Sequence, residues 1–228
     1  MTLEILPDAD SLARRAVSVI AADARAAVAA RGRFVMAVSG GKSPWVMLAA
    51  LANEDVPWAK VHVFQIDERI ASAGDPDRNY KHLRASLVEH VPIPSDQIYP
   101  MPVESPDLNA AAKEYARTLQ RVAGKPPVLD LVHLGIGPDG HTASLIPNDP
   151  VLNVSNADVA ITGVYQGRRR MTLTYPVIDR SRRILWLVSG KDKAAALAKL
   201  RAADPSIPAG RISRSQALLL ADRDAAGE

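Results

Sequence analysis

The chain has 228 residues, 47% of them hydrophobic, and its 28 basic and 25 acidic residues leave a formal net charge of only +3. This composition favours a folded domain with a sizeable core, and the charge balance does not by itself indicate a nucleic-acid partner. The absence of cysteine excludes disulfides, thiolate metal sites and a cysteine nucleophile. Because no break in composition divides the chain, we expect a single domain over residues 1–228.

Targeting signals are not evident in the sequence. The first ten residues, MTLEILPDAD, lack the basic and apolar regions of a secretory signal, and no segment reaches the roughly 20 apolar residues that span a bilayer. We therefore expect a cytoplasmic protein without membrane contact. The sequence leaves its oligomeric state open between a monomer and a small homo-oligomer.

The first predicted elements are a long helix, a strand and a second helix. Asp10 or Ser11 can cap an amphipathic helix that runs to about residue 31, where a glycine stops it. The apolar run RFVMAV, over 33–38, predicts a buried strand. After a tight loop, Pro44 is placed to open the helix PWVMLAALA.

The middle of the chain repeats this alternation. VHVFQID, over 61–67, predicts a strand, and after a charged loop Asn79 is placed to cap a helix that runs to Val88. Asp107 can cap a further helix that ends at the Gly-Lys-Pro-Pro turn, and the apolar run 129–134 predicts the next strand.

The last third of the chain completes the pattern. A helix is predicted over 191–202, and strands are predicted over 158–164, 171–174, 184–188 and 217–221. Short apolar strands that alternate with helices indicate an α/β fold with a mostly parallel sheet. We expect helices on both faces of this sheet, in a Rossmann-like three-layer architecture.

Three loops are expected at the carboxyl ends of strands, where ligands bind in such sheets. They cover residues 39–44, 67–78 and 135–142, and all three carry glycine or charged residues. Their convergence is the first sign of a functional site.

The first loop, SGGKSP, resembles a nucleotide-binding P-loop only in part. That motif requires a glycine five residues before Gly41, and position 36 is methionine. Two glycines before a helix still allow the backbone N–H groups to approach an anion closely. The loop therefore predicts a phosphate site, with a simple strand-to-helix turn as the alternative.

The third loop contains GIGPDGH, which has the glycine spacing of a dinucleotide-binding fingerprint. Pro138 removes one of the N–H groups that would donate to a pyrophosphate, and the motif comes late in the chain. His141 is the more informative residue, because a neutral imidazole at a strand-to-helix loop can accept a proton from water near pH 7. A polar helix cap is the alternative role for His141. No HExxH pattern or second histidine at ligand spacing indicates a metal.

Six segments together resemble the 6-phosphogluconolactonase family, which shares its fold with glucosamine-6-phosphate deaminases. The matches run in order along nearly the whole chain and are SGGKSP (39–44), WAKVHVFQIDER (58–69), RNYKHLR (78–84), LGIGPDGHTASLIP (134–147), RMTLT (170–174) and SGKDKA (189–194). The fourth is the most specific, because lactonases look like GxGxDGHxASLFP there and deaminases continue differently after DGH. The run TASL, over 142–145, therefore favours a lactonase.

The resemblance implies hydrolysis of 6-phospho-D-glucono-1,5-lactone to 6-phospho-D-gluconate, in the oxidative pentose phosphate pathway, without a metal or an organic cofactor. In this assignment His141 is the general base that activates water, Asp139 orients it, and Asp67 is a further polar group of the catalytic set. The phosphorylated lactone is expected to contact Ser39, Gly40, Gly41, Ser43, Arg69, Arg170 and Lys193. Arg69 is assigned to either the phosphate or the lactone carbonyl.

Two other functions stay open at this point. A glucosamine-6-phosphate deaminase or isomerase would release ammonia from its amino-sugar substrate. A non-catalytic sugar-phosphate sensor or nucleic-acid binder would use two arginine clusters, at 168–170 and 180–183, which can equally form a solvated face. Because no recognition helix or aromatic RNA-binding motif is present, we expect no nucleic-acid partner.

Overall fold

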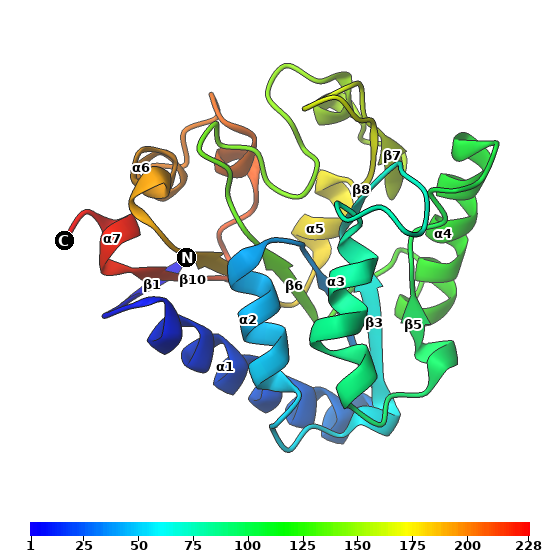
Figure 1. Cartoon of the computed structure of the whole chain (residues 1–228), viewed down its shortest axis with the longest axis horizontal. Helices are drawn as coiled ribbons and strands as arrows, with labels where there is room; N and C mark the ends of the chain where they lie inside the picture. The colour runs from blue at the N-terminus through cyan, green and yellow to red at the C-terminus, as the bar shows by residue number, and fades with distance from the viewer.

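A seven-stranded sheet forms the centre of the computed structural model, which describes all residues 1–228. Its strand order is β1-β10-β9-β6-β2-β3-β5, and every neighbouring pair is parallel. Figure 1 shows β1 and β10 at one side of this sheet and β3 and β5 at the other. The strands are β1 (Thr2–Leu6), β2 (Phe34–Val38), β3 (Val61–Gln65), β5 (Ile98–Tyr99), β6 (Leu131–Leu134), β9 (Ile184–Val188) and β10 (Ala217–Asp222).

Helices cover both faces of this sheet, as the sequence predicted. They are α1 (Ala9–Arg31), α2 (Lys42–Leu51), α3 (Asn79–Ser86), α4 (Leu108–Ala123), α5 (Tyr175–Arg180), α6 (Ala194–Arg201) and α7 (Arg223–Ala226). Alternate residues along β2 point to opposite layers: Phe34 and Met36 pack with α1, α2 and α3, whereas Val35 and Ala37 belong to the core that includes α4, α5 and α6. The arrangement is the expected three-layer α/β fold.

A second, three-stranded sheet lies beside the carboxyl edge of the large one. Its order is β4-β8-β7, and its strands β4 (Asp67–Arg69), β7 (Val159–Ile161) and β8 (Arg170–Leu173) pair antiparallel. The sequence predicted one strand over 61–67, but the chain leaves the large sheet after Gln65 and Asp67 pairs with Thr172. The expectation of a single continuous strand was therefore wrong.

The order of the strands places a switch point between β2 and β6. From β2 the chain continues outward through β3, and from β6 it continues in the other direction through β9. Loops that leave such a pair diverge and open a crevice at the carboxyl ends of the strands. The loops over 39–44 and 135–142 leave the sheet at this point.

The ends of the helices have capping residues, although neither candidate for the α1 N-cap, Asp10 or Ser11, is the cap. The N-cap of α1 is Asp8, whose carboxylate accepts from the Ser11 N–H, so the helix begins before the predicted caps. The helix ends at Gly32 in the left-handed conformation, as predicted. Asp107 caps α4 as predicted and accepts from the Ala110 N–H.

Other differences from the predicted elements are small. α2 begins at Lys42, two residues before the predicted start at Pro44. Asn79 is the first residue of α3 and not its cap, and this helix ends at Ser86. The predicted helix over 191–202 is a 3-10 turn followed by α6. The elements β1, β5, α5 and α7 were not predicted at all.

Candidate active site

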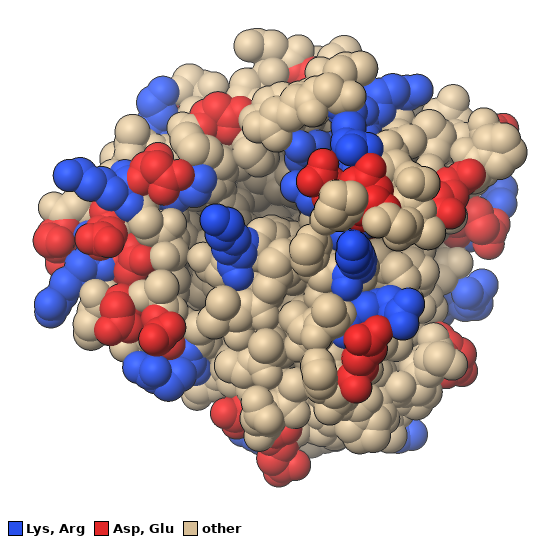
Figure 2. Space-filling model, viewed as in Figure 1, with Lys and Arg blue, Asp and Glu red and all other residues tan.

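A cleft of about 610 Å³ opens at the carboxyl edge of the large sheet, next to the small sheet. Figure 2 shows this hollow, with basic side chains gathered around it. The cleft is lined by every predicted site residue except Asp139: Ser39, Gly40, Gly41, Ser43, Asp67, Arg69, His141, Arg170 and Lys193. Residues from five separate stretches of the sequence therefore meet in one place.

His141 lies in the cleft with its Nδ1 atom 2.6 Å from Asp139 Oδ1. An ionised carboxylate only accepts hydrogen bonds, so this contact places the proton on Nδ1. Nε2 has no hydrogen-bond partner within the protein and is free to accept a proton. The carboxylate keeps a lowered pKa despite the opposing effect of burial, because it accepts hydrogen bonds from the His141 and Tyr165 side chains.

The turn that carries His141 depends on two glycines. A Cβ at Gly137 would lie 2.1 Å from His141 Nδ1, so a side chain there would displace the imidazole ring. Gly140 has a φ of 82°, in the left-handed region, and packs directly against Ile207. The sequence predicted a strand-to-helix loop here, but the chain continues through turns and no α-helix follows His141 directly. His141 is therefore not a helix cap.

The loop after β2 forms a second wall of the cleft. α2 begins at Lys42 with Gly41 as its N-cap, at a φ of 132°, and no side chain caps this end. The N–H groups of Gly40, Gly41, Lys42 and Ser43 donate to no acceptor within the protein. Free amides at the positive end of a helix dipole suit an anion such as a phosphate.

Asp67 anchors a third wall, at the start of β4. Its carboxylate is buried and accepts a hydrogen bond from Ser144 Oγ at 2.6 Å, and its backbone carbonyl accepts from Asn79 Nδ2 at 3.0 Å. Asn79 Oδ1 in turn accepts from Arg69 Nη1 at 2.6 Å. A Cβ at Gly40 would lie 2.0 Å from Asn79 Oδ1, which explains the glycine there. Neither Asn79 nor Ser144 was among the predicted site residues.

Arg170 is the first residue of β8 and is only 5% exposed. Its Nη2 donates to Gln166 Oε1 at 3.2 Å, its guanidinium carbon lies 5.0 Å from the centre of the Tyr165 ring, and its Nε has no partner. Burial lowers the pKa of Arg170, although a guanidinium stays charged at neutral pH. A buried cation with an unpaired N–H in a cleft is suited to bind an anionic group.

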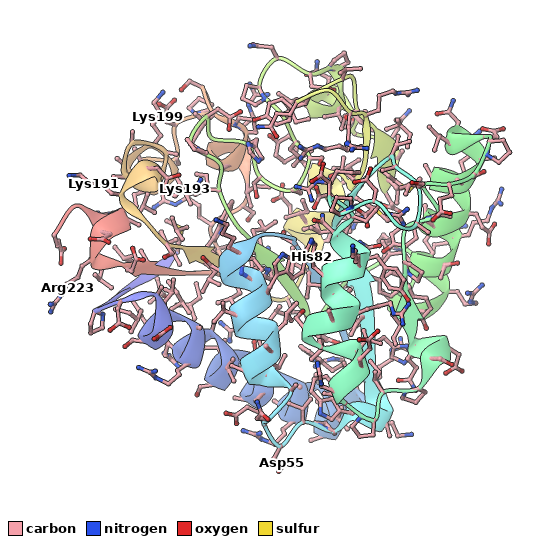
Figure 3. The ribbon with its side chains drawn as sticks, in the orientation of Figure 1. Asp55, His82, Lys191, Lys193, Lys199 and Arg223 are labelled. Carbon is pink, nitrogen blue, oxygen red and sulfur yellow. The ribbon has the colours of Figure 1, made fainter.

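Two lysines complete the positive surface of the cleft. Lys193 directly precedes α6, and its Nζ lies 2.9 Å from Asp192 Oδ2. Figure 3 shows Lys193 on the α6 side of the molecule and His82 on α3. Lys42, at the start of α2, also lines the cleft, and the sequence analysis did not assign it as a site residue although it belongs to SGGKS.

The other histidines lie outside the cleft. His133 is fully buried in β6, where burial lowers its pKa to about 4, and its Nδ1 accepts from the Ser39 N–H. His62 contacts the Tyr99 hydroxyl at 3.0 Å. At the surface, His82 Nε2 donates to the Pro76 carbonyl and His90 Nε2 donates to the Ala85 carbonyl.

The arginine clusters form ion pairs within the protein. Arg168 lies 2.9 Å from Asp75, Arg180 lies 2.7 Å from Asp158, and Arg183 pairs with Asp23. Only Arg170 of the two clusters lines the cleft. These three ion pairs do not favour the sensor or nucleic-acid binder considered above, because each of the three guanidinium groups already has a carboxylate partner.

Two structural properties bear on cofactors and membranes. The structure has no group of three or more histidine, aspartate or glutamate side chains that could hold a metal ion. None of its helices is both long and apolar enough to cross a membrane.

Known proteins resemble this chain over nearly all of its length. Residues 7–220 match the family described as glucosamine-6-phosphate isomerases/6-phosphogluconolactonase. A 6-phosphogluconolactonase from Mycobacterium tuberculosis is 41% identical over 241 aligned residues, covering 100% of this chain and 98% of the relative. One from Synechocystis is 37% identical over 224 residues, covering 96% and 93%. The solved 6-phosphogluconolactonase from Thermotoga maritima superposes with a TM-score of 0.87, at 24% identity over 97% of this chain and 98% of that one, and so has the same fold.

Proposed function

Since this chain belongs to the family of glucosamine-6-phosphate isomerases and 6-phosphogluconolactonases, we propose that it hydrolyses 6-phospho-D-glucono-1,5-lactone to 6-phospho-D-gluconate. This is a step of the oxidative pentose phosphate pathway. The observation that carries the proposal is the His141–Asp139 pair at 2.6 Å, with Nε2 free, in a cleft whose other walls suit a phosphate. The 6-phosphogluconolactonases that are 36–41% identical to this chain favour this activity over that of a deaminase.

The first step uses His141 as a general base. As water attacks the lactone carbonyl carbon, Nε2 takes one of its protons, and the Asp139 carboxylate stabilises the imidazolium that forms. Asp139 also fixes the tautomer, because its hydrogen bond holds the proton on Nδ1. Its partner Tyr165 keeps the carboxylate in place through a 2.8 Å hydrogen bond.

The attack places negative charge on the former carbonyl oxygen. Arg69 and Arg170 line the same cleft and bring two guanidinium groups for this oxyanion and for the phosphate. When the tetrahedral intermediate collapses, the bond from the carbonyl carbon to the ring oxygen breaks. The proton on His141 then passes to the ring oxygen, which becomes a hydroxyl group of the open product, and the new carboxylic acid ionises.

The phosphate end of the substrate supplies binding energy away from the reacting carbon. The free amides of Gly40 and Gly41, the Ser43 hydroxyl and the Lys193 ammonium are the groups assigned to it. Fixing the far end of the ring orients the lactone carbonyl against Nε2, and orientation of this kind lowers the barrier of the chemical step. Asp67 supports the third wall of the cleft, because its carboxylate accepts a hydrogen bond from Ser144 and its backbone carbonyl accepts one from Asn79.

A timed lactone-opening assay tests the proposed function. The initial rate of 6-phosphogluconate formation is measured with and without protein, because the lactone also opens slowly in water. We expect a rate far above the spontaneous one, and no ammonia from glucosamine 6-phosphate under the same conditions. Ammonia release without lactone opening would assign the chain to the deaminase branch of its family instead.

The sequence also predicted a cytoplasmic location and a monomer or small homo-oligomer. Both stay predictions, and they are tested by fractionation of the cells of origin and by light scattering of the purified chain. Neither outcome alters the residues assigned to the cleft.

A further inference from the structure

The hairpin between β7 and β8 brings Tyr165 to the rim of the active-site cleft. Tyr165 and Arg168 form a bridge across it, and the two residues between them, Gln166 and Gly167, have φ values of 51° and 78°. Two successive residues in the left-handed conformation form the tight two-residue turn that reverses the chain in a β-hairpin. The turn therefore fixes the position of Tyr165 relative to β8.

The Tyr165 hydroxyl is bonded to the partner of the general base. Oη donates to Asp139 Oδ2 at 2.8 Å, while Asp139 Oδ1 accepts from His141. The two oxygens of one carboxylate are thus held by two different side chains. The Tyr165 ring also lies edge-on to the imidazole of His141, with 5.4 Å between the ring centroids and 63° between the planes.

The Tyr165 ring has a second contact, with the buried cation of the cleft. The guanidinium carbon of Arg170 lies 5.0 Å from the ring centroid, a cation–π distance. Gln166, the neighbour of Tyr165, accepts a hydrogen bond from the same guanidinium. One hairpin therefore contacts both the acid–base pair and a cation assigned to the substrate.

We propose that Tyr165 is a positioning residue that couples the His141–Asp139 pair to Arg170. Its hydroxyl holds Asp139 and thereby His141, while its ring supports Arg170. The proposal rests on the lactonase function proposed above and adds to it a residue outside the six segments that carry the family resemblance. The hydroxyl and the ring do separate tasks, so separate substitutions can remove them one at a time.

The hydroxyl also affects the charge that His141 experiences. The hydrogen bond from the Tyr165 hydroxyl withdraws part of the negative charge of the Asp139 carboxylate. Without this hydrogen bond, the carboxylate would stabilise the imidazolium form of His141 more strongly. The hydroxyl itself stays protonated, since burial and the Asp139 hydrogen bond raise the pKa of Tyr165 to about 12. The other charged groups that line the cleft are Lys42, Asp67, Arg69, Arg170, Asp192 and Lys193.

Tyr165→Phe removes the hydroxyl and keeps the ring. We expect kcat for lactone hydrolysis to fall about fivefold, the effect of one lost hydrogen bond, with little change in KM. The acidic limb of the pH–rate profile should move to higher pH. Tyr165→Leu removes the ring as well, and should in addition raise KM because Arg170 loses its support.

An NMR titration of the His141 ring in the ligand-free protein gives a readout that does not depend on activity. Its titration curve should move to higher pH in Tyr165→Phe, and the cross-peak is assigned by its absence in a His141 variant. Tyr99→Phe is the matched control, because it removes a tyrosine hydroxyl that contacts a different histidine, His62. We expect the His141 curve and the kinetics to be unchanged in this control.

The outcomes separate the two proposals. A His141 curve and a pH–rate profile that superpose on those of the unmodified protein in Tyr165→Phe would overturn the role of Tyr165. Absence of lactonase activity in the unmodified protein would overturn the proposed function instead, while the NMR curve would still report on the Tyr165–Asp139–His141 chain. Circular dichroism of each variant shows that the effects do not come from unfolding.

Discussion

The two sheets of this protein contribute different kinds of group to the same cleft. The parallel sheet ends in two turns, which present the free amides at 40–43 and the His141 imidazole. The antiparallel sheet presents Asp67 and Arg170, both of them buried. The comparison indicates a division of labour, in which turns at the end of the parallel sheet position the proposed proton acceptor and the small sheet provides buried charge.

The largest expected effect comes from the turn on the parallel sheet. His141→Ala removes the proposed base, and we expect kcat to fall about 10²–10⁴-fold while KM changes little, because the phosphate-binding groups remain. Initial rates of lactone opening, corrected for the spontaneous reaction, measure this. His90→Ala, on the surface outside the cleft, is the control; a His141 variant with near-normal kcat would remove the residue from the mechanism.

A smaller effect is expected when the turn is disturbed and the imidazole is kept. The methyl group of Gly137→Ala would collide with the His141 ring, so the ring must move. Misplacement of a catalytic group by about 1 Å can lower the rate roughly 10²-fold. Gly74→Ala is the matched control, because a Cβ there meets nothing within 4 Å. Equal kcat values for the two variants would show that Gly137 does not position the base.

One cation from each sheet allows a direct comparison of the two. Arg170 is the first residue of β8 in the small sheet, and Lys193 follows β9 of the large sheet. Arg170→Met and Lys193→Met each remove a charge and keep much of the side chain. Because Arg170 is buried and Lys193 is already paired with Asp192, we expect KM to rise by about 10²-fold for Arg170→Met and by roughly tenfold or less for Lys193→Met. Steady-state kinetics of both variants measure the difference. The reverse order would mean that Lys193 contributes more to binding the phosphate than Arg170 does.

The smallest effect concerns the stability of the parallel sheet in acid. His133 is buried and its folded-state pKa is lowered from 6.5 to about 4, so below pH 6.5 the unfolded chain binds a proton that the folded chain does not. The free energy of unfolding should therefore fall as the pH decreases from about 6.5 to about 4, by roughly 3 kcal/mol at most. Urea unfolding at several pH values measures this.

His133→Leu provides the control for that titration. The variant has no ionisable group at this position, so its free energy of unfolding should depend less on pH over the same interval. Parallel pH dependences for the two proteins would show that His133 does not contribute to acid destabilisation.

Much of the parallel sheet could be predicted, because its strands are short apolar runs between turns. The strand 184–188 was predicted at its observed bounds, and Asp107 was correctly identified as a helix cap. β1 and β5 were missed because one lies at the start of the chain and the other has only two residues. Such edge strands are recognised by their pairing partners and carry little periodicity of their own.

The candidate site was predicted where the residues lie in motifs at strand ends. The phosphate loop and the His141 turn follow β2 and β6, and strand order brings them together. Tyr165 lies in no such motif, and its role depends on its contact with the Asp139 carboxylate. Ser144 lies in the run TASL, but the sequence does not show its contact with the Asp67 carboxylate. Contacts between distant parts of the chain leave no local pattern.

The sequence by itself determined the layered α/β architecture, and it indicated the loop 39–44 as a candidate anion site and His141 as the candidate base. These properties depend on neighbouring residues: hydrophobic periodicity, glycines and the chemistry of one side chain. Tertiary structure alone decided that the chain leaves the large sheet after Gln65 and that Asp67 pairs with Thr172 in a second sheet. The physical reason is that antiparallel pairing, buried hydrogen bonds and cation–π contacts depend on distances between segments that are separated by many residues.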